Sequence, residues 1–249
     1  MRTMFDHVTH PALAAAAFLL AATAAPAAAQ AEEPFPSATP ESVGLSSKAL
    51  EALGEEVASY IDREMAVGAE LLVIKDRQTV LHEAYGWRDR EAEVPMEPDT
   101  LFNIRSMTKP VTGAAAQALI DDGLLALDDR VADHLPGFDN DASGEITVEQ
   151  LLTHTSGLPL TTVQSTDQYD SLRAMADATG VGGPEFEPGS KFWYSDAGTD
   201  VLGAVIEAAS GMPLADYVSE RLLDPLGMDD SYYPGAPDDS QLDRTASLY

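Results

Sequence analysis

A serine and a lysine three positions apart, Ser106 and Lys109, stand where an extended segment meets an apolar helical pattern. Residues 100–104 have the pattern of a short extended lead-in, and the apolar residues in 111–119 have helical spacing until Gly123 ends it. Residues three apart share one helix face, so the lysine amine is predicted to reach the serine hydroxyl. A helix start favours an oxyanion, and an amine that loses pKa through desolvation can act as a base near neutral pH. The pattern therefore predicts an activated serine; the alternative is a capping serine beside a solvated lysine.

The segment before this serine predicts one helix followed by a hairpin. Apolar residues in 50–61 follow helical spacing, and either Ser46 or Ser47 is expected to cap that helix. Strands are predicted near 69–75 and 79–85, with a turn between them. This part of the chain is therefore expected to form an α/β unit.

Beyond the serine, the sequence predicts mainly short helices. Residues 147–150 have the pattern of a capping box, and Pro213 is expected to start a helix that Pro225 stops. A helix is also expected over 200–210, closed by Gly211. No internal repeat is present.

Four segments between residues 102 and 196 carry a resemblance to a known family. They are residues 102–110, 127–131, 151–159 and 188–196. Together they resemble the serine β-lactamase and penicillin-binding-protein superfamily, in particular the class C β-lactamases and the family VIII esterases. The resemblance implies an α/β (α+β) fold of two lobes, one α/β and one all-α, with the site between them. It also implies acylation of the S-x-x-K serine, with the lysine and a tyrosine from Y-x-N as base and proton relay.

Transferred residue by residue, the resemblance implies that Ser106 is the nucleophile, Lys109 its partner and Tyr194 the second base. Tyr194 follows Ser106 by 88 residues, which fits class C enzymes, whereas the S-D-N element of class A enzymes follows after roughly 60. Tyr194, and not Ser195, is therefore expected to be functional. A tyrosine can act as a base only where cations such as Lys109 stabilise its phenolate. The alternative is an aromatic residue packed beneath the following helix.

Asp196 departs from the family pattern, because it stands where the substrate-binding asparagine of Y-x-N is expected. An ionised aspartate cannot donate a hydrogen bond to a substrate carbonyl, and it repels the carboxylate that β-lactams carry. Asp196 could instead cap the following helix or pair with Lys109. The substitution weakens the β-lactamase interpretation and favours an esterase or an unassigned hydrolase.

The closing strand of the family is the second departure. No K-T-G, H-x-G or W-x-G follows Tyr194 before the sequence ends at Tyr249. In the family that strand supplies one of two oxyanion N–H groups, which can contribute roughly 3–4 kcal/mol, and it would pair with the first hairpin. We therefore expect a fragment of a longer gene product, incomplete in its C-terminal strands, with an open apolar edge on that hairpin.

Residues 1–30 have the pattern of a cleaved secretory signal peptide. Arg2 precedes an apolar run over 12–25, and the small residues Ala27 and Ala29 follow it. The run is too short and too rich in alanine for a convincing membrane span. The chain contains no cysteine, which excludes both a lipoprotein anchor and disulfides. A secreted or periplasmic protein without stable membrane insertion is predicted.

The remaining sequence divides into a linker rich in Pro, Ser and Glu over 31–44 and a β-lactamase-related domain over 45–249. The whole chain has a net charge of −28, so nucleic acid and anionic membranes should be repelled. The acidic residues form short clusters along the chain, which suits a surface adapted to high salt or a plain acidic surface.

Other chemistries have less support, and neither a cofactor nor a metal is predicted. No G-x-S-x-G or H-E-x-x-H occurs, which argues against a histidine-based triad or a zinc protease. His154 is expected to fix the 155–157 turn by hydrogen bonds. Residues 139–150 imitate a calcium-binding loop, but Gln150 stands where the bidentate glutamate is required.

The sequence therefore predicts an exported serine hydrolase that acts on a small ester, amide or β-lactam through an acyl-Ser106 intermediate. Two alternatives stay open. One is a non-catalytic or degenerate penicillin-binding relative, and the other is a D-alanyl-D-alanine carboxypeptidase. The sequence does not choose among ester, β-lactam and D-Ala-D-Ala substrates, and it predicts no oligomeric state.

Overall fold

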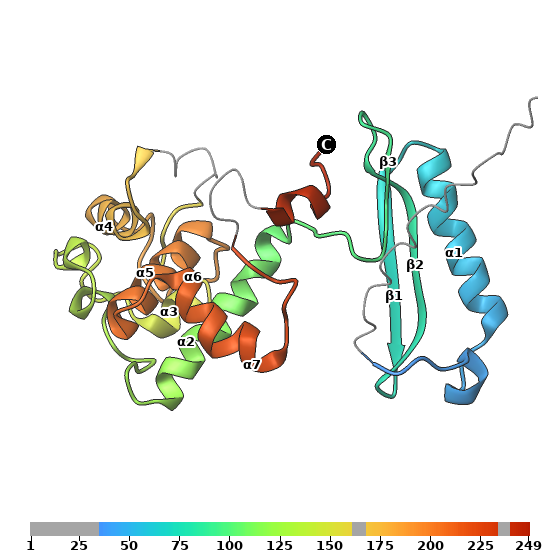
Figure 1. Cartoon of the computed structure of the whole chain (residues 1–249). Coiled ribbons are helices and arrows are strands. Elements are labelled where there is room, and N and C mark those ends of the chain that lie inside the picture. Colours follow the sequence, from blue (N-terminus) through green and yellow to red (C-terminus); the bar gives the residue numbers. More distant parts are fainter. Residues whose placement is uncertain (1–34, 161–167, 234–239) are drawn as a thin grey trace, which may run out of the picture.

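The computed structural model describes residues 35–160, 168–233 and 240–249, and Figure 1 shows them as two lobes. A small sheet covered by one helix forms the first lobe, and a group of short helices forms the second (Figure 1). The predicted mixed α/β class is confirmed. The predicted signal peptide at 1–30 lies outside the described residues.

The α/β lobe packs helix α1 (Ser47–Asp62) against the sheet, with the predicted cap at Ser46, whose side chain accepts a hydrogen bond from the Ala49 N–H. The strands are β1 (Gly68–Lys75), β2 (Gln78–Asp89) and β3 (Val94–Pro95), in the antiparallel order β1-β2-β3. Gly54 is the buried residue of α1. A Cβ there would lie 2.6 Å from the Tyr85 hydroxyl, so glycine allows the helix to approach β2.

The predicted hairpin is present, and β2 runs beyond its predicted end to pair with β3. Asp76 and Arg77 form the turn with φ values of 53° and 60°, the sign that a two-residue type I′ turn requires. No strand pairs with the second edge of β1 among the described residues. Leu72 and Ile74 of β1 are each 40% exposed and, being two positions apart, lie on the same face of the sheet.

The described end of the predicted linker lies against the sheet. Ala38 donates its N–H to the Thr79 carbonyl, and the Thr79 N–H donates to the Pro36 carbonyl. A 3₁₀ turn over Pro40–Val43 follows, and Gly44 ends it with φ 75°. These hydrogen bonds fix the segment that precedes α1.

The all-α lobe contains the closed hydrophobic core. Its helices are α2 (Thr108–Asp121), α3 (Val148–Leu152), α4 (Leu172–Gly182), α5 (Asp196–Ser210), α6 (Leu214–Val218) and α7 (Asp224–Leu226). α5 lies at the centre, with Val201, Val205 and Ile206 fully buried, and α2, α3 and α4 pack against it. Each such side chain contributes about 1.5–3 kcal/mol through burial. The core therefore holds in place the helices that bear the candidate site.

Two helix boundaries in this lobe test the sequence predictions. The capping box at the start of α3 is confirmed, because the Thr147 and Gln150 side chains each bond the backbone N–H of the other. The prediction that Pro225 stops a helix is wrong. The helical segment continues from α6 through a π-helical turn into α7 and ends at Leu226, followed by Gly227 with φ 64°. Pro225 is tolerated because it lies in the first turn of α7, where the backbone N–H that proline lacks is not needed as a donor.

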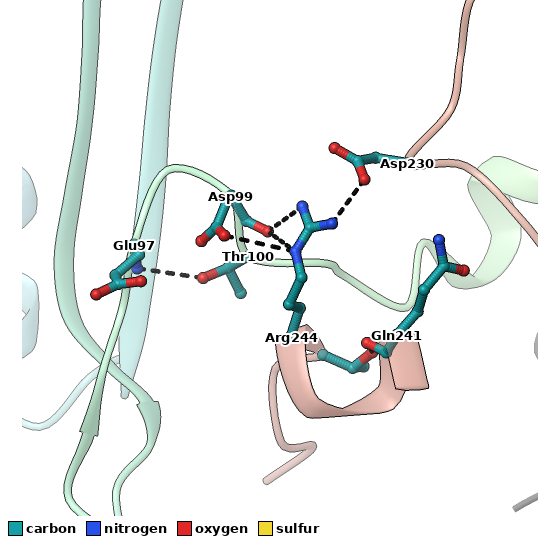
Figure 2. A network of polar contacts seen from close by, with 7 residues as sticks. Glu97, Asp99, Thr100, Asp230, Gln241 and Arg244 are labelled. Carbon is teal, nitrogen blue, oxygen red and sulfur yellow. Dashed lines mark hydrogen bonds and ion pairs between the residues drawn. The ribbon is translucent and has the colours of Figure 1, made fainter. Parts of the chain in front are cut away.

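The C-terminal segment lies between the lobes, beside the strand-like stretch that leads to Ser106 (Figure 1). Leu101 pairs in parallel with Thr245, donating to the Arg244 carbonyl and accepting from the Ala246 N–H. The Arg244 guanidinium donates to the Asp99 carbonyl at 2.7 Å and to Asp230 Oδ1 at 2.7 Å, as Figure 2 shows. This network anchors the approach to the candidate site, and the sequence alone did not indicate it.

No single helix among the described residues has the length and apolar composition of a membrane span, although α5 and 214–226 do when taken together across a 79° bend.

Candidate active site

Ser106 lies in a 3₁₀ turn, Arg105–Met107, that leads directly into α2. The prediction of a helix starting at the serine is therefore modified, because α2 itself begins at Thr108. Arg105 has φ 50°, in the left-handed region that costs a non-glycine residue energy, and its N–H donates to Asn103 Oδ1. Ser106 is exposed at the start of a helical segment, and the N–H of the next residue, Met107, donates to the Ile104 carbonyl.

Lys109 reaches the serine as predicted. Its Nζ lies 3.3 Å from Ser106 Oγ, close enough to donate a hydrogen bond. The Lys109 side chain is only 17% exposed, so the alternative of a solvated lysine is not what the structure shows. The geometry permits proton transfer between the two groups.

Asp196 lies in the first turn of α5 and pairs with Lys109, which was one of the alternatives left open. Its Oδ1 lies 2.6 Å from Lys109 Nζ. The helix cap is Ser195, whose buried hydroxyl accepts from the Gly198 N–H at 2.9 Å. Asp196 is thus an acidic residue at the positive end of a helix, where its charge is favoured.

The expectation that desolvation leaves Lys109 with a lowered pKa is wrong. Burial does pull the Lys109 pKa down, but the Asp196 carboxylate and the Tyr194 hydroxyl outweigh it, and the net pKa lies above its ordinary value. An ion pair at 2.6 Å stabilises the ammonium form more than partial burial destabilises it. Lys109 is therefore an ammonium group in the free protein at neutral pH.

Tyr194 joins the same cluster. Its ring centroid lies 4.8 Å from Lys109 Nζ, and the side chain is 40% exposed. It lines the cavity and is not buried beneath α5, so the packing alternative does not describe it. The structure thus brings together all four residues predicted from the sequence: Ser106, Lys109, Tyr194 and Asp196.

His154 also belongs to the site, although the sequence predicted a different contact for it. It was expected to fix the 155–157 turn, but its Nδ1 accepts the Ser195 N–H at 3.3 Å. Its ring lies 4.8 Å from the Tyr194 ring. Burial, and then the Lys109 charge, lower the His154 pKa. The one sequence signal for His154 was its position within the family-like segment 151–159. No local pattern predicts a contact between residues 41 positions apart.

Asp200 is a second acidic group behind the cluster, one helical turn after Asp196 on α5. Burial and the neighbouring Asp196 raise its pKa from 3.8 to about 6, against the opposing effect of Lys109. Sequence analysis did not single it out, because its burial arises from the packing of α5.

Ser106, Lys109, His154 and Tyr194 line a cavity of about 530 Å³ between α2, α3 and α5. The lining residues are Ser106, Met107, Lys109, Pro110, Gly113, Leu151, Leu152, His154, Tyr194, Thr199 and Leu202. The polar groups gather at the serine, and the rest of the wall is mainly apolar. A small molecule with an apolar part and one reacting carbonyl suits such a wall. No cluster of three or more metal-ligating side chains occurs in the described ranges.

Comparisons with known proteins agree with this fold. The family model described as Beta-lactamase matches residues 57–249. The esterase EstB of Burkholderia gladioli is 36% identical over 220 residues, which cover 79% of this chain and 55% of the esterase. Protein flp of Staphylococcus aureus strain MW2 is 33% identical over 167 residues, 65% of this chain and 34% of that protein. The chain spans about half or less of the length of these curated relatives.

Solved structures of related proteins share this fold. EstCE1, described as a hydrolase with promiscuous acyltransferase activity, superposes with a TM-score of 0.70 at 28% identity, covering 81% of this chain and 57% of EstCE1. A family VIII carboxylesterase superposes with a TM-score of 0.68 at 27% identity, covering 83% of this chain and 57% of the carboxylesterase.

Proposed function

This chain belongs to the Beta-lactamase family, and from that premise we propose that it is a serine hydrolase that cleaves small esters or amides through an acyl-Ser106 intermediate. The observation that carries the proposal is the 3.3 Å approach of Lys109 Nζ to Ser106 Oγ. The similarity to an esterase and to a family VIII carboxylesterase supports the reaction class.

In the proposed reaction, Ser106 Oγ attacks the substrate carbonyl carbon and the bond to the leaving alcohol or amine breaks. The serine proton passes through the fraction of Lys109 that is neutral, with Tyr194 relaying it to the leaving group. The backbone N–H of Ser106, in the turn that leads into α2, is the proposed donor to the developing oxyanion. Water then hydrolyses the acyl-serine, returning the proton to the same cluster.

The charge of the site favours neutral esters over β-lactams and D-Ala-D-Ala peptides. Asp196 is 36% exposed beside Lys109, so a substrate carboxylate approaching this cation meets a carboxylate already bound to it. The net charge of −28 adds a general repulsion of anions. Short neutral esters therefore suit the site better than the anionic alternatives.

A fluorophosphonate probe tests the proposal on the chain itself. We expect one adduct by intact mass, mapped to Ser106 and lost in Ser106→Ala. Ser190→Ala is the matched control, because this exposed serine precedes Tyr194 and its hydroxyl donates to the Glu187 carbonyl in its own turn. Labelling that survives Ser106→Ala would refute the assignment.

Substrate comparison then separates the alternatives. We expect p-nitrophenyl butyrate to acylate Ser106 faster than nitrocefin does. Stable labelling by a fluorescent penicillin without release would indicate the penicillin-binding alternative instead, and release of D-alanine from a D-Ala-D-Ala peptide would indicate the carboxypeptidase.

We also propose export, supported by the signal-like pattern of residues 1–30. N-terminal sequencing of protein secreted by an expressing bacterium should give a start near residue 30. Recovery of the uncleaved chain from the cytoplasm alone would contradict export.

A further inference from the structure

His154 holds the backbone on both sides of Tyr194. Its carbonyl accepts the Trp193 N–H at 2.8 Å, and its ring Nδ1 accepts the Ser195 N–H at 3.3 Å. These two hydrogen bonds enclose the Tyr194 peptide between them. Because Nδ1 is an acceptor here, the neutral ring carries its proton on Nε2.

The His154 ring also fixes the direction of the Tyr194 side chain. The two ring planes are 34° apart at a centroid distance of 4.8 Å. Phe192 meets the His154 ring edge-on at 5.9 Å, which limits its freedom to turn. Tyr194 is thereby held with Lys109 Nζ 4.8 Å from its ring centroid.

We infer that His154 is a positioning residue for Tyr194, which orients the tyrosine toward Lys109 and Ser106 only while its Nδ1 can accept the Ser195 N–H. This inference rests on the proposed function, and it adds a residue that the S-x-x-K and Y-x-N patterns do not contain. His154 acts through Tyr194 and is not assigned any contact with the reacting atoms.

Protonation of His154 should release this arrangement, because a proton on Nδ1 replaces the lone pair that accepts the Ser195 N–H. The charged groups that act on the ring are Lys109 from α2, which opposes protonation, and Asp196 from α5, which favours it. Burial also opposes protonation, and the net effect holds the His154 pKa below its ordinary value. The ring is therefore neutral at pH 7 and above, and its Nδ1 still accepts the Ser195 N–H there.

Two isosteric variants separate the acceptor from the rest of the side chain. His154→Asn keeps an acceptor near the Nδ1 position, whereas His154→Leu has the same shape without one. Residue 154 has φ 55°, which asparagine tolerates better than leucine, so thermal unfolding of both variants is measured first. His134→Asn is the control, because His134 does not line the cavity.

The rate constant of Ser106 acylation, taken from the p-nitrophenol burst with p-nitrophenyl butyrate, is the first readout. At pH 8 we expect His154→Leu to lose ~10–100-fold, the scale of a misplaced catalytic group, and His154→Asn to recover most of that loss. In the unmodified chain, a plot of the logarithm of this rate constant against pH should steepen from a slope of one to a slope of two below the pH at which His154 titrates. In His154→Asn the slope should stay at one. Equal rates for Asn and Leu variants, or an unchanged slope in the unmodified chain, would overturn the inference.

A second readout does not need catalysis. With ¹³C-labelled tyrosine, the Tyr194 ring resonance should shift with the same midpoint as the ¹⁵N resonances of His154, and this shift should vanish in His154→Asn. A Tyr194 resonance that ignores the His154 titration would refute the positioning role even in an active protein. A coupled titration without Ser106 acylation would instead refute the proposed function and leave the positioning role intact.

Discussion

The Nζ atom of Lys109 lies 2.6 Å from Oδ1 of Asp196, closer than its 3.3 Å approach to Ser106 Oγ. A carboxylate thus competes with the serine for the amine that should activate it. The pairing explains why the Lys109 pKa lies above its ordinary value despite burial. Asp196 therefore sets how much neutral amine is available at a given pH.

Replacing Asp196 by asparagine should move the activity profile to lower pH. Without the carboxylate, Tyr194 still opposes the effect of burial but Asp196 no longer does, so the Lys109 pKa falls and more of the amine is neutral at pH 7. The Ser106 acylation rate at pH 7 should rise about tenfold for each unit by which that pKa falls. The rate of fluorophosphonate labelling between pH 6 and 10 measures this shift.

Asp200→Asn is the matched control for that experiment. It removes the same charge from α5 one turn further along, without breaking the pair to Lys109. Its profile should shift less than that of Asp196→Asn. Equal shifts in the two variants would mean that overall charge, and not the ion pair, governs Lys109.

Lys109 and Tyr194 should act as a unit in proton transfer. Lys109→Ala and Tyr194→Phe should each lower the Ser106 acylation rate by at least ~100-fold, the range for a lost general base. The double variant should lose less than the product of the two, because either change alone already breaks the relay. Losses that multiply fully, in variants with unchanged melting temperatures, would show that the two side chains act independently.

Asp200 should destabilise the protein at neutral pH. Its folded pKa is raised to about 6, so the folded state holds this proton more tightly than the unfolded state between about pH 4 and 6. The penalty grows as pH rises through that window and is fully present above it. Asp200→Asn should therefore raise the free energy of unfolding at pH 7.5 by about 1–2 kcal/mol, after discounting for partial exposure, and by little at pH 3.5.

Urea unfolding at the two pH values measures the difference, with Asp128→Asn, an exposed aspartate of the same lobe, as control. A gain of the same size at both pH values would contradict the assignment of the effect to Asp200 ionisation.

Replacing Gly180 of α4 by alanine should destabilise the protein. An added Cβ would lie 2.4 Å from Cδ2 of Phe138, whose ring is fully buried and cannot move aside. Overpacking of this kind costs about 1–3 kcal/mol, which outweighs the gain of up to about 1 kcal/mol in helix propensity. Gly182→Ala, in the same helix with no atom within 4 Å, should be neutral or stabilising. Equal unfolding free energies for the two variants would rule out the packing argument.

Local sequence patterns predicted much of the fold. The cap at Ser46, the hairpin, and the capping box at residues 147–150 were all predicted, because each depends on residues close together in the sequence. Strand β3 and the end of α7 were missed. A two-residue strand has no pattern of its own, and a proline is tolerated wherever a new helical turn begins.

The sequence by itself determined that Ser106 and Lys109 would meet, since helical geometry brings side chains three positions apart together. Only the tertiary structure decided that Lys109 is paired with Asp196, and that His154 fixes the Ser195 N–H instead of its own turn. These contacts join α2, the residues after α3 and the start of α5 through the packed core. Their distances and charges, and hence the basicity of the lysine, follow from that packing and are absent from any single segment.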